Sequence, residues 1–419
     1  MEQMKPSETE RGRQWLNNFD SVDRPTARLL LNSVRFTSTG HMVTSIRDRL
    51  IELIEAGRIE APVFLVPVLA KEDISPLSLN EENANPFANR PDRHVAYKTY
   101  MPNSGISSTP GSEGLIGRIV RDIIERRLLD GTKVLPTESS LADLRAARCR
   151  SIVLVTDYNG SGTQIGDFAK TLVRHPTLRS WRSGKLLRIH ALSFASTEQA
   201  TKNARCPGGP LDGYSTLEIV KSLQDSSWGE IQRESIQSLC KRYAIKGLKK
   251  QALGYKSSGG LFVSDLGVPN NIPAILRQMS EGWSPFFENR VVPQQLVAEL
   301  GDYVPVIPLS QSTANAGQIR LARNLKEDRG RRSGRLMLTA LSVINMGTVS
   351  DEELAFKLSV TVPMAEKILE SLLLLGFISN DRKLTEAGRK ELDAGKKSPR
   401  KVVPLSGGTT EPYYPRTMR

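Results

Sequence analysis

The residues with the clearest chemical potential lie in the segment 156–163, TDYNGSGT. It follows the apolar run Ser151–Val155, which predicts a buried strand, and it precedes Ile165–Val173, whose apolar residues have helical spacing. Backbone amides of a glycine-rich turn can converge on an anion, the hydroxyls of Ser161 and Thr163 add donors, and the helix N-terminus adds a favourable dipole. The pattern indicates a phosphate site, and it leaves open a tight strand-to-helix turn that binds no nucleotide.

Three further pairs of polar residues suit the same ligand, and each pair has a structural alternative. The pairs are Ser112 and Glu113, Tyr255 and Lys256, and Asn270 and Asn271. The first pair begins a predicted helix, so it either contacts substrate or caps that helix and balances its dipole. The second contacts a phosphate or a base, or leaves its lysine solvated at a sheet edge. The third lies between prolines and either contacts ligand or forms a turn.

The elements that would position these residues alternate between strand and helix. Apolar, β-rich runs at Pro62–Leu69, Ser151–Val155 and Leu186–Phe194 predict parallel strands, and helical patterns lie between them. We therefore expect an α/β fold with a doubly wound parallel sheet. Helical spacing in residues 1–60 predicts a helical N-terminal subdomain before that sheet, whereas residues 292–317 look irregular.

The C-terminal part has the pattern of a winged helix. Three helices are predicted at Leu336–Ile344, Asp351–Leu358 and Pro363–Leu375, followed by a short hairpin and a last helix, Glu386–Leu392. The third helix is expected to expose Glu366, Lys367, Glu370 and Ser371. Because helices that read bases usually offer Arg, Lys, Asn or Gln, this face favours docking onto a protein or a structured nucleic acid.

These patterns divide the chain into five parts and show which parts contain clusters of basic residues. The parts are a helical subdomain (1–60), an α/β domain (61–317), a basic linker (318–332), a winged helix (333–394) and a basic, disordered tail (395–419). The candidates for nucleic-acid binding are Arg329, Arg331, Arg332, Arg335, Lys396 and Lys397. They would bind phosphates without sequence preference, and the alternative is that both basic segments are solvated linkers.

Composition narrows the class of protein. The 419 residues carry a formal net charge of +13, which favours an anionic partner. No apolar run is long enough to cross a membrane and no secretory signal is present, so we expect a cytoplasmic protein. The three cysteines and four histidines have no metal-ligand spacing, so we expect no metal held by protein side chains alone.

Several motifs, taken together, resemble a known family. VLVTDYNGSGTQI (Val153–Ile165) is similar to the ribose-phosphate loop of type I phosphoribosyltransferases, in which two adjacent acids follow a buried strand. With this loop, four more motifs in order resemble the phosphoribosyltransferase-like effectors of bacterial conflict systems (PRTase-CE type) between about Trp15 and Arg290. These motifs are WLxxFD from Trp15, PGSEG from Pro110, GYK from Gly254, and VPNN from Val268 with WxPFF from Trp283.

The resemblance implies a type I phosphoribosyltransferase-like parallel sheet and a role for each residue of the loop. Asp157 would be catalytic and hold the ribose hydroxyls, with Mg²⁺ assisting a phosphate leaving group. The ligand-binding residues implied in the loop are Thr156, Asn159, Gly160, Ser161, Gly162 and Thr163. Thr156 stands where the family has an acid. The missing carboxylate removes negative charge that would stabilise a cationic sugar.

The resemblance also implies a biological setting. The chain would be a toxic effector of a retron anti-phage system, which transfers or cleaves at C1′ of a ribose-5-phosphate-containing ligand. Its partners would be a reverse transcriptase and a structured RNA or msDNA-type RNA/DNA, and association into homo-oligomers stays open. Two alternatives remain at this stage: a catalytically degenerate module that binds a nucleotide and assembles with nucleic acid, and a ligand-sensing transcription regulator with a winged helix.

Overall fold

The computed structural model describes residues 3–68, 122–123, 133–135, 139–224, 228–326, 332–347 and 349–396. The chain divides into two compact units, which we describe separately. One unit comprises Met1–Val306 with Ser350–Lys367, and the other comprises Ile307–Val349 with Ile368–Arg419.

A four-stranded parallel sheet forms the centre of the first unit. Its strands are β2 (Val63–Pro67), β3 (Ser151–Asn159), β4 (Arg188–Thr197) and β5 (Gly213–Val220), in the order β2-β3-β4-β5. The sheet and its intervening helices confirm the α/β class. The order runs in one direction, so the described strands lack the reversal that we expected of a doubly wound sheet.

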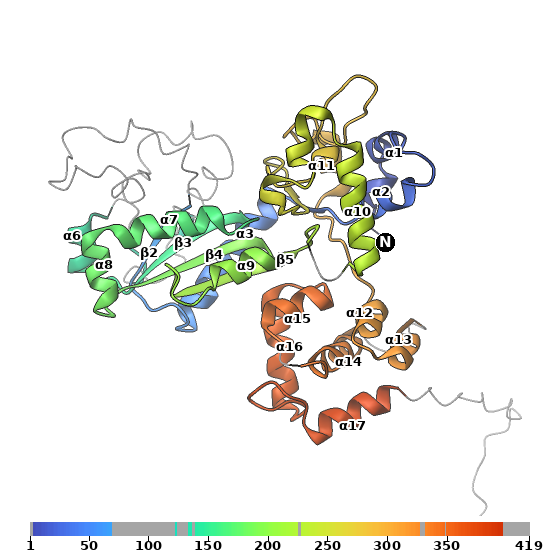
Figure 1. Ribbon diagram of the computed structural model, residues 1–419. Helices are drawn as coiled ribbons and strands as arrows, with labels where there is room; N and C mark the ends of the chain where they lie inside the picture. The colour runs from blue at the N-terminus through green and yellow to red at the C-terminus, as the bar shows by residue number, and fades with distance from the viewer. Residues whose placement is uncertain are drawn as a thin grey trace, which may run out of the picture. The chain divides into compact units, whose positions relative to one another are not determined.

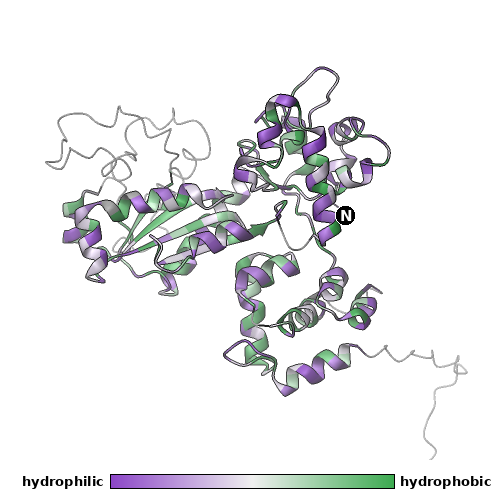
Figure 2. Ribbon diagram, in the orientation of Figure 1, coloured by the Kyte–Doolittle hydropathy of each residue, from purple (hydrophilic) through white to green (hydrophobic). Residues whose placement is uncertain are grey.

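Helices cover both faces of this sheet, as the apolar composition of its strands requires (Figures 1 and 2). On one face, Ile152 and Leu154 of β3 share a core with buried residues of three helices, and on the other Val153 and Val155 pack with Met42 and Ile46. The helices of the first face are α6 (Leu141–Ala146), α7 (Thr163–Arg174) and α8 (Pro176–Ser183), and the helix of the second is α3 (Thr39–Glu55).

A second core lies beside the sheet and joins segments that are distant in sequence. Strand β1 (Arg35–Thr37), within the segment expected to be helical, pairs in parallel with β6 (Phe262–Ser264). The helices that pack here are α1 (Glu10–Leu16), α2 (Arg24–Leu31), α10 (Glu230–Tyr243) and α11 (Gln294–Leu300). Phe19 belongs to this core, and its ring centroid lies 4.6 Å from that of Trp15 and 5.5 Å from that of Trp283.

Several elements were not expected from the sequence. Strand β5 and helix α9 (Glu198–Ala204) complete the sheet region, and residues 292–317, expected to be irregular, contain α11 and α12 (Leu309–Asn315). Helix α13 (Ile319–Lys326) occupies most of the expected basic linker and buries Leu321, Ala322 and Leu325. Short 3₁₀ helices are η1 (Pro6–Glu8), η6 (Lys246–Gln251), η7 (Tyr255–Ser257) and η8 (Ala274–Leu276).

The helices predicted for the winged helix are present. They are α14 (Arg332–Ile344), α15 (Asp351–Leu358), α16 (Val362–Leu374) and α17 (Glu386–Gly395). Helix α15 begins as predicted, because the Ser350 hydroxyl accepts a hydrogen bond from the Glu353 amide. Between α16 and α17, Ile378 and Leu384 form the antiparallel bridge of a short hairpin. None of the helices in the described ranges is long and apolar enough to span a bilayer.

Candidate functional site

The predicted phosphate loop lies between the carboxyl end of β3 and the start of α7. Thr156 and Asn159 near the end of the strand are buried, with exposed fractions of 4% and 3%. Gly162 is the N-cap residue of α7, and its φ of 79° lies in the left-handed region that glycine adopts most readily. Because the N-cap residue has no side chain of its own, the first turn of α7 is not capped by it and faces the loop.

Side chains from the sheet and from α9 fix the loop in shape. The Gly162 amide donates to Asn159 Oδ1 at 3.0 Å, within the loop itself. From α9 and its N-cap residue, Thr197 Oγ1 donates to the Gly160 carbonyl at 2.9 Å and Asn203 Nδ2 donates to the Ser161 carbonyl at 3.2 Å. The loop is therefore held in one conformation before any ligand arrives, which lowers the entropy cost of binding.

A buried polar network lies beneath the loop. Asn159 Nδ2 donates to the Tyr214 hydroxyl at 3.0 Å, and that hydroxyl is 2.7 Å from Ser193 Oγ. Ser193 Oγ in turn donates to Thr216 Oγ1 at 3.0 Å. Burial raises the pKa of Tyr214, so its hydroxyl stays protonated and the network stays neutral. Neutral, satisfied networks of this kind make a site rigid.

Two distant motifs meet the loop at Asn271, a residue that is 3% exposed. Its Nδ2 donates to the Tyr158 hydroxyl at 2.9 Å, and a Cβ added to Gly160 would lie 2.3 Å from that nitrogen. A Cβ on Gly254 would lie 1.8 Å from the Asn271 carbonyl oxygen, and one on Gly260 would lie 1.9 Å from the Tyr158 hydroxyl. Glycines thus allow the GYK and VPNN motifs to approach the loop closely.

Asn271 Oδ1 is buried without a hydrogen-bond partner among the described residues.

Lys256 supplies positive charge at the loop. Its Nζ donates to Thr163 Oγ1 at 3.3 Å, at the N-terminus of α7, and lies 5.5 Å from the ring centroid of Tyr255. The backbone of Lys256 has a φ of 49°, a conformation that most residues avoid. The Lys256 ammonium and the dipole of α7 together favour an anion at this point.

Asp157 places a carboxylate at the other end of the loop. Its Oδ1 accepts a hydrogen bond from Thr156 Oγ1 at 3.3 Å. Burial raises the pKa of the neighbouring Tyr158, an effect opposed by the hydrogen bond from Asn271 and reinforced by the Asp157 charge. No group of three or more His, Cys, Asp or Glu side chains could hold a metal ion within the described ranges. Asp157 alone therefore fits Mg²⁺ only together with oxygens of a ligand phosphate.

The structure brings together most of the predicted ligand-binding residues. Those at the loop are Thr156, Asp157, Asn159, Gly160, Ser161, Gly162, Thr163, Lys256 and Asn271. Tyr255 and Asn270 are exposed neighbours that bond to each other through the backbone. Ser112 and Glu113 lie outside the described residues.

Sequence reasoning did not find Tyr158, Thr197, Asn203 or Tyr214 as parts of the site. Thr197 could have been predicted as a site residue, because it ends β4 and the carboxyl ends of neighbouring parallel strands meet at one edge of a sheet. We had expected that strand to end at Phe194, which left Thr197 outside it. Asn203 and Tyr214 belong to α9 and β5, neither of which was predicted.

Of the six candidate nucleic-acid-binding residues, the structure describes the side chains of two. Arg335 is half-buried in α14, and Lys396 Nζ forms an ion pair with Asp393 Oδ1 at 2.7 Å. The side chain of Arg332 is not among those described, and Arg329, Arg331 and Lys397 lie outside the described residues. These positions stay predictions.

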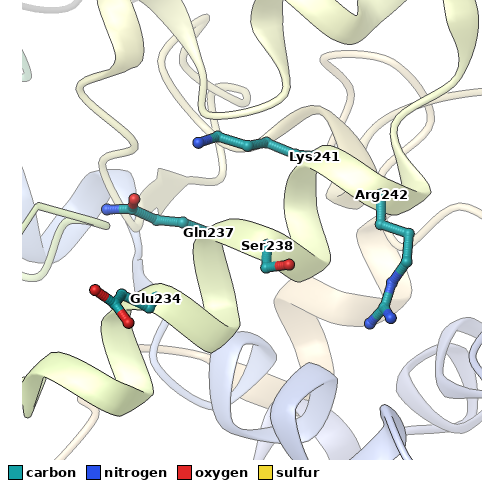
Figure 3. A pocket seen from close by; sticks show the side chains of 5 residues that line it. All are labelled: Glu234, Gln237, Ser238, Lys241 and Arg242. Carbon is teal, nitrogen blue, oxygen red and sulfur yellow. The ribbon is translucent and has the colours of Figure 1, made fainter.

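A hollow on α10 is lined by Glu234, Gln237, Ser238, Lys241 and Arg242. Figure 3 shows that all five side chains project from a single helix. Ligand sites usually combine groups from several elements in a concave, partly apolar cleft, so we do not assign this hollow to the phosphate loop or to a second ligand.

Comparisons with known proteins identify the family. The model of the family PRTase-CE matches residues 13–289, which is more than half of the chain, and the model described as wHTH-PRTase associated matches residues 338–419. No curated protein and no solved structure matches the chain. The first match covers β1 to β6 and contains the phosphate loop, Lys256 and Asn271. The chain therefore belongs to the PRTase-CE family of phosphoribosyltransferase-like proteins and carries the winged helix-turn-helix domain associated with it.

Proposed function

We propose that the chain binds a ribose-5-phosphate-containing ligand at the loop Gly160–Thr163. The observation that carries this proposal is the Lys256 ammonium, which lies 3.3 Å from the Thr163 hydroxyl at the start of α7. A lysine brought to a helix N-terminus by a separate segment of chain is an arrangement suited to a phosphate. Thr163 Oγ1 and the first-turn amides of α7 supply further donors.

The reaction that fits this geometry is transfer or cleavage at C1′ of the bound sugar. With the phosphate at α7, the ribose extends toward Asp157, whose carboxylate accepts hydrogen bonds from ribose hydroxyls. The bond from C1′ to the leaving group breaks and the leaving group keeps the electron pair. An acceptor or water then bonds to C1′ and releases a proton to solvent. Asp157 stabilises the positive charge that develops on the sugar. Mg²⁺ bound to a ligand phosphate would neutralise charge on the leaving group.

We further propose that the chain is a toxic effector of a retron anti-phage system in the cytoplasm. Its partners in that setting are a reverse transcriptase and its RNA/DNA product. The support is the sequence resemblance, together with a net charge of +13 that favours a polyanionic partner.

Replacing Lys256 with methionine should weaken binding of ribose 5-phosphate by about 10- to 100-fold, because a hydrogen bond to a charged group contributes about 1.5–3 kcal/mol. Isothermal titration calorimetry of the purified chain measures this directly. Lys250→Met is the matched control, since Lys250 is also an exposed lysine but lies in η6 rather than in η7, the element of Lys256. Equal affinities for Lys256→Met and the unaltered chain would contradict the proposed site.

Replacing Asp157 with asparagine should lower turnover at C1′ by about 10- to 100-fold, since the neutral amide no longer balances a cationic sugar. Release of pyrophosphate or free base from phosphoribosyl pyrophosphate and from nucleotides provides the assay. Asp167→Asn is the control, because Asp167 is an exposed acid on α7 that pairs with Lys170. Undiminished turnover in Asp157→Asn would remove this residue from the mechanism.

One observation favours a second candidate function, a binding module without catalysis. Thr156, where the family has an acid, is buried and donates to Asp157 instead of offering a second carboxylate. Such a domain would bind a nucleotide and assemble with nucleic acid, but leave the ligand intact. Detectable turnover of phosphoribosyl pyrophosphate would rule this candidate out.

A further inference from the structure

The segment Ser350–Lys367 belongs to the same compact unit as the α/β sheet. It contains α15 and the first turns of α16, the two helices that follow α14. Two of its acids are largely covered: the side chain of Glu352 is 8% exposed and that of Glu366 is 13% exposed. We had expected Glu366 to face solvent, and that expectation was wrong. Acids are rarely this well covered unless they are paired.

Glu366 binds two arginines near α3. Arg49 Nη2 donates to Glu366 Oε1 at 2.6 Å, and Arg58 Nη1 lies 2.9 Å from Glu366 Oε2. Burial alone would raise the pKa of Glu366, but the hydrogen bonds and charges of Arg49 and Arg58 lower it below its usual value. The carboxylate is therefore ionised and paired with both arginines, and its negative charge repels phosphates.

Glu352 binds Arg205, which follows α9. Arg205 Nη1 donates to Glu352 Oε2 at 2.8 Å, and its Nη2 donates to Glu352 Oε1 and, at 3.0 Å, to the Tyr214 carbonyl. This bidentate pairing has the fixed geometry of a guanidinium and a carboxylate. A lysine in place of Arg205 would keep the charge but lose that geometry.

Helix α9 connects this ion pair to the phosphate loop. Its N-cap residue Thr197 donates to the Gly160 carbonyl, Asn203 in its last turn donates to the Ser161 carbonyl, and Arg205 is its C-cap residue. One short helix therefore contacts both the loop and Glu352. Movement of α15 that displaced Arg205 would shift the groups that hold Gly160 and Ser161.

We infer that Ser350–Lys367 is a docking element for the α/β body of this same chain, and that its Glu352–Arg205 pair steadies the phosphate loop through α9. Glu352 is thus a positioning residue for the proposed ligand site, and Glu366 anchors the other end of the element on α3. The second half of this inference rests on the proposed function, whereas the docking itself does not.

Hydrogen exchange measured by mass spectrometry tests the docking without any ligand. In Glu352→Gln, amides of residues 159–166 and 197–205 should exchange about five-fold faster or more than in the unaltered chain. Glu353→Gln is the matched control, because Glu353 lies on the same helix and pairs with Lys357 near the surface; it should change nothing. Glu366→Gln should speed exchange in α3 and leave residues 159–166 less affected than Glu352→Gln does.

Two results would overturn the inference. One is unchanged exchange at residues 159–166 in both Glu352→Gln and Arg205→Lys. The other is an equal rise in those residues and in β2, which would mean a general loosening of the fold. A melting temperature for each variant, determined alongside, confirms that the chain is folded during the measurement.

Titration with ribose 5-phosphate then separates the docking from the proposed function. If the unaltered chain binds it, Glu352→Gln should bind it at least about five-fold more weakly, the lower end of typical coupling between sites, and equal affinity would overturn the coupling. If the unaltered chain does not bind it, the proposed function fails at that ligand, and the exchange data still decide whether the segment steadies the loop.

Discussion

Replacing Gly254 with alanine is expected to destabilise the first unit by more than about 3 kcal/mol. Gly254 has a φ of 78°, and a Cβ there would lie 1.8 Å from the carbonyl oxygen of Asn271 and 2.4 Å from its carbonyl carbon. Both atoms are backbone, so no side-chain rotation relieves the clash. Urea unfolding followed by circular dichroism measures the loss.

Gly247→Ala is the control for this substitution. Gly247 lies in the nearby 3₁₀ helix η6, and a Cβ there would meet nothing within 4 Å. Its free energy of unfolding should change by less than about 0.5 kcal/mol, as is usual for an unobstructed surface position. Similar stability in the two variants would show that the GYK motif does not approach Asn271 as closely as described.

Replacing Arg35 with methionine is expected to cost about 3–5 kcal/mol of stability, because it leaves a covered carboxylate without its partner. Arg35 Nε and Nη2 donate to the two oxygens of Glu218 at 2.8 and 2.9 Å, and the two side chains are 3% and 13% exposed. Arg35 also donates to the Tyr303 carbonyl at 3.1 Å. Loss of this side chain therefore affects β1, β5 and the segment after α11 together.

A double variant tests whether the unpaired acid causes the loss. Adding Glu218→Gln to Arg35→Met should restore part of the stability, since the charge that lost its partner is then removed. Arg47→Met is the surface control: its partner Asp48 is 60% exposed, and pairs of this kind contribute about 0–1 kcal/mol. A loss for Arg35→Met no larger than for Arg47→Met would contradict the buried-pair account.

The parts of the fold that follow from local sequence were predicted well. Strand β3, the glycine turn and α7 have an apolar run, a break and helical spacing in direct succession, and Ser350 is an N-cap by its own chemistry. Strand β5 was missed because Ser215, Glu218 and other polar residues interrupt its apolar pattern. Its polar groups bond to partners distant in sequence: Thr216 Oγ1 accepts a hydrogen bond from Ser193 across the sheet, and Glu218 pairs with Arg35.

The site itself was predicted residue by residue but not as an arrangement. Lys256 and Asn271 were candidates because of their motifs, yet their contacts with Thr163 and Tyr158 join segments that no local pattern connects. Glu366 shows what helical periodicity cannot predict. Helical periodicity gives the face on which a residue lies, but not whether another part of the chain covers that face.

The pairing of β1 with β6 affects the order in which the chain folds during its synthesis. Thr37 emerges from the ribosome before β2 to β5, whereas its partner Ser264 follows only after these strands have been synthesised. Contacts between residues this distant form slowly, because a long loop must close before the pairing gains any energy. Until then the apolar side of α1 and α2 lacks part of its core. Helices α1 and α2 are thus synthesised well before the segment that completes their core.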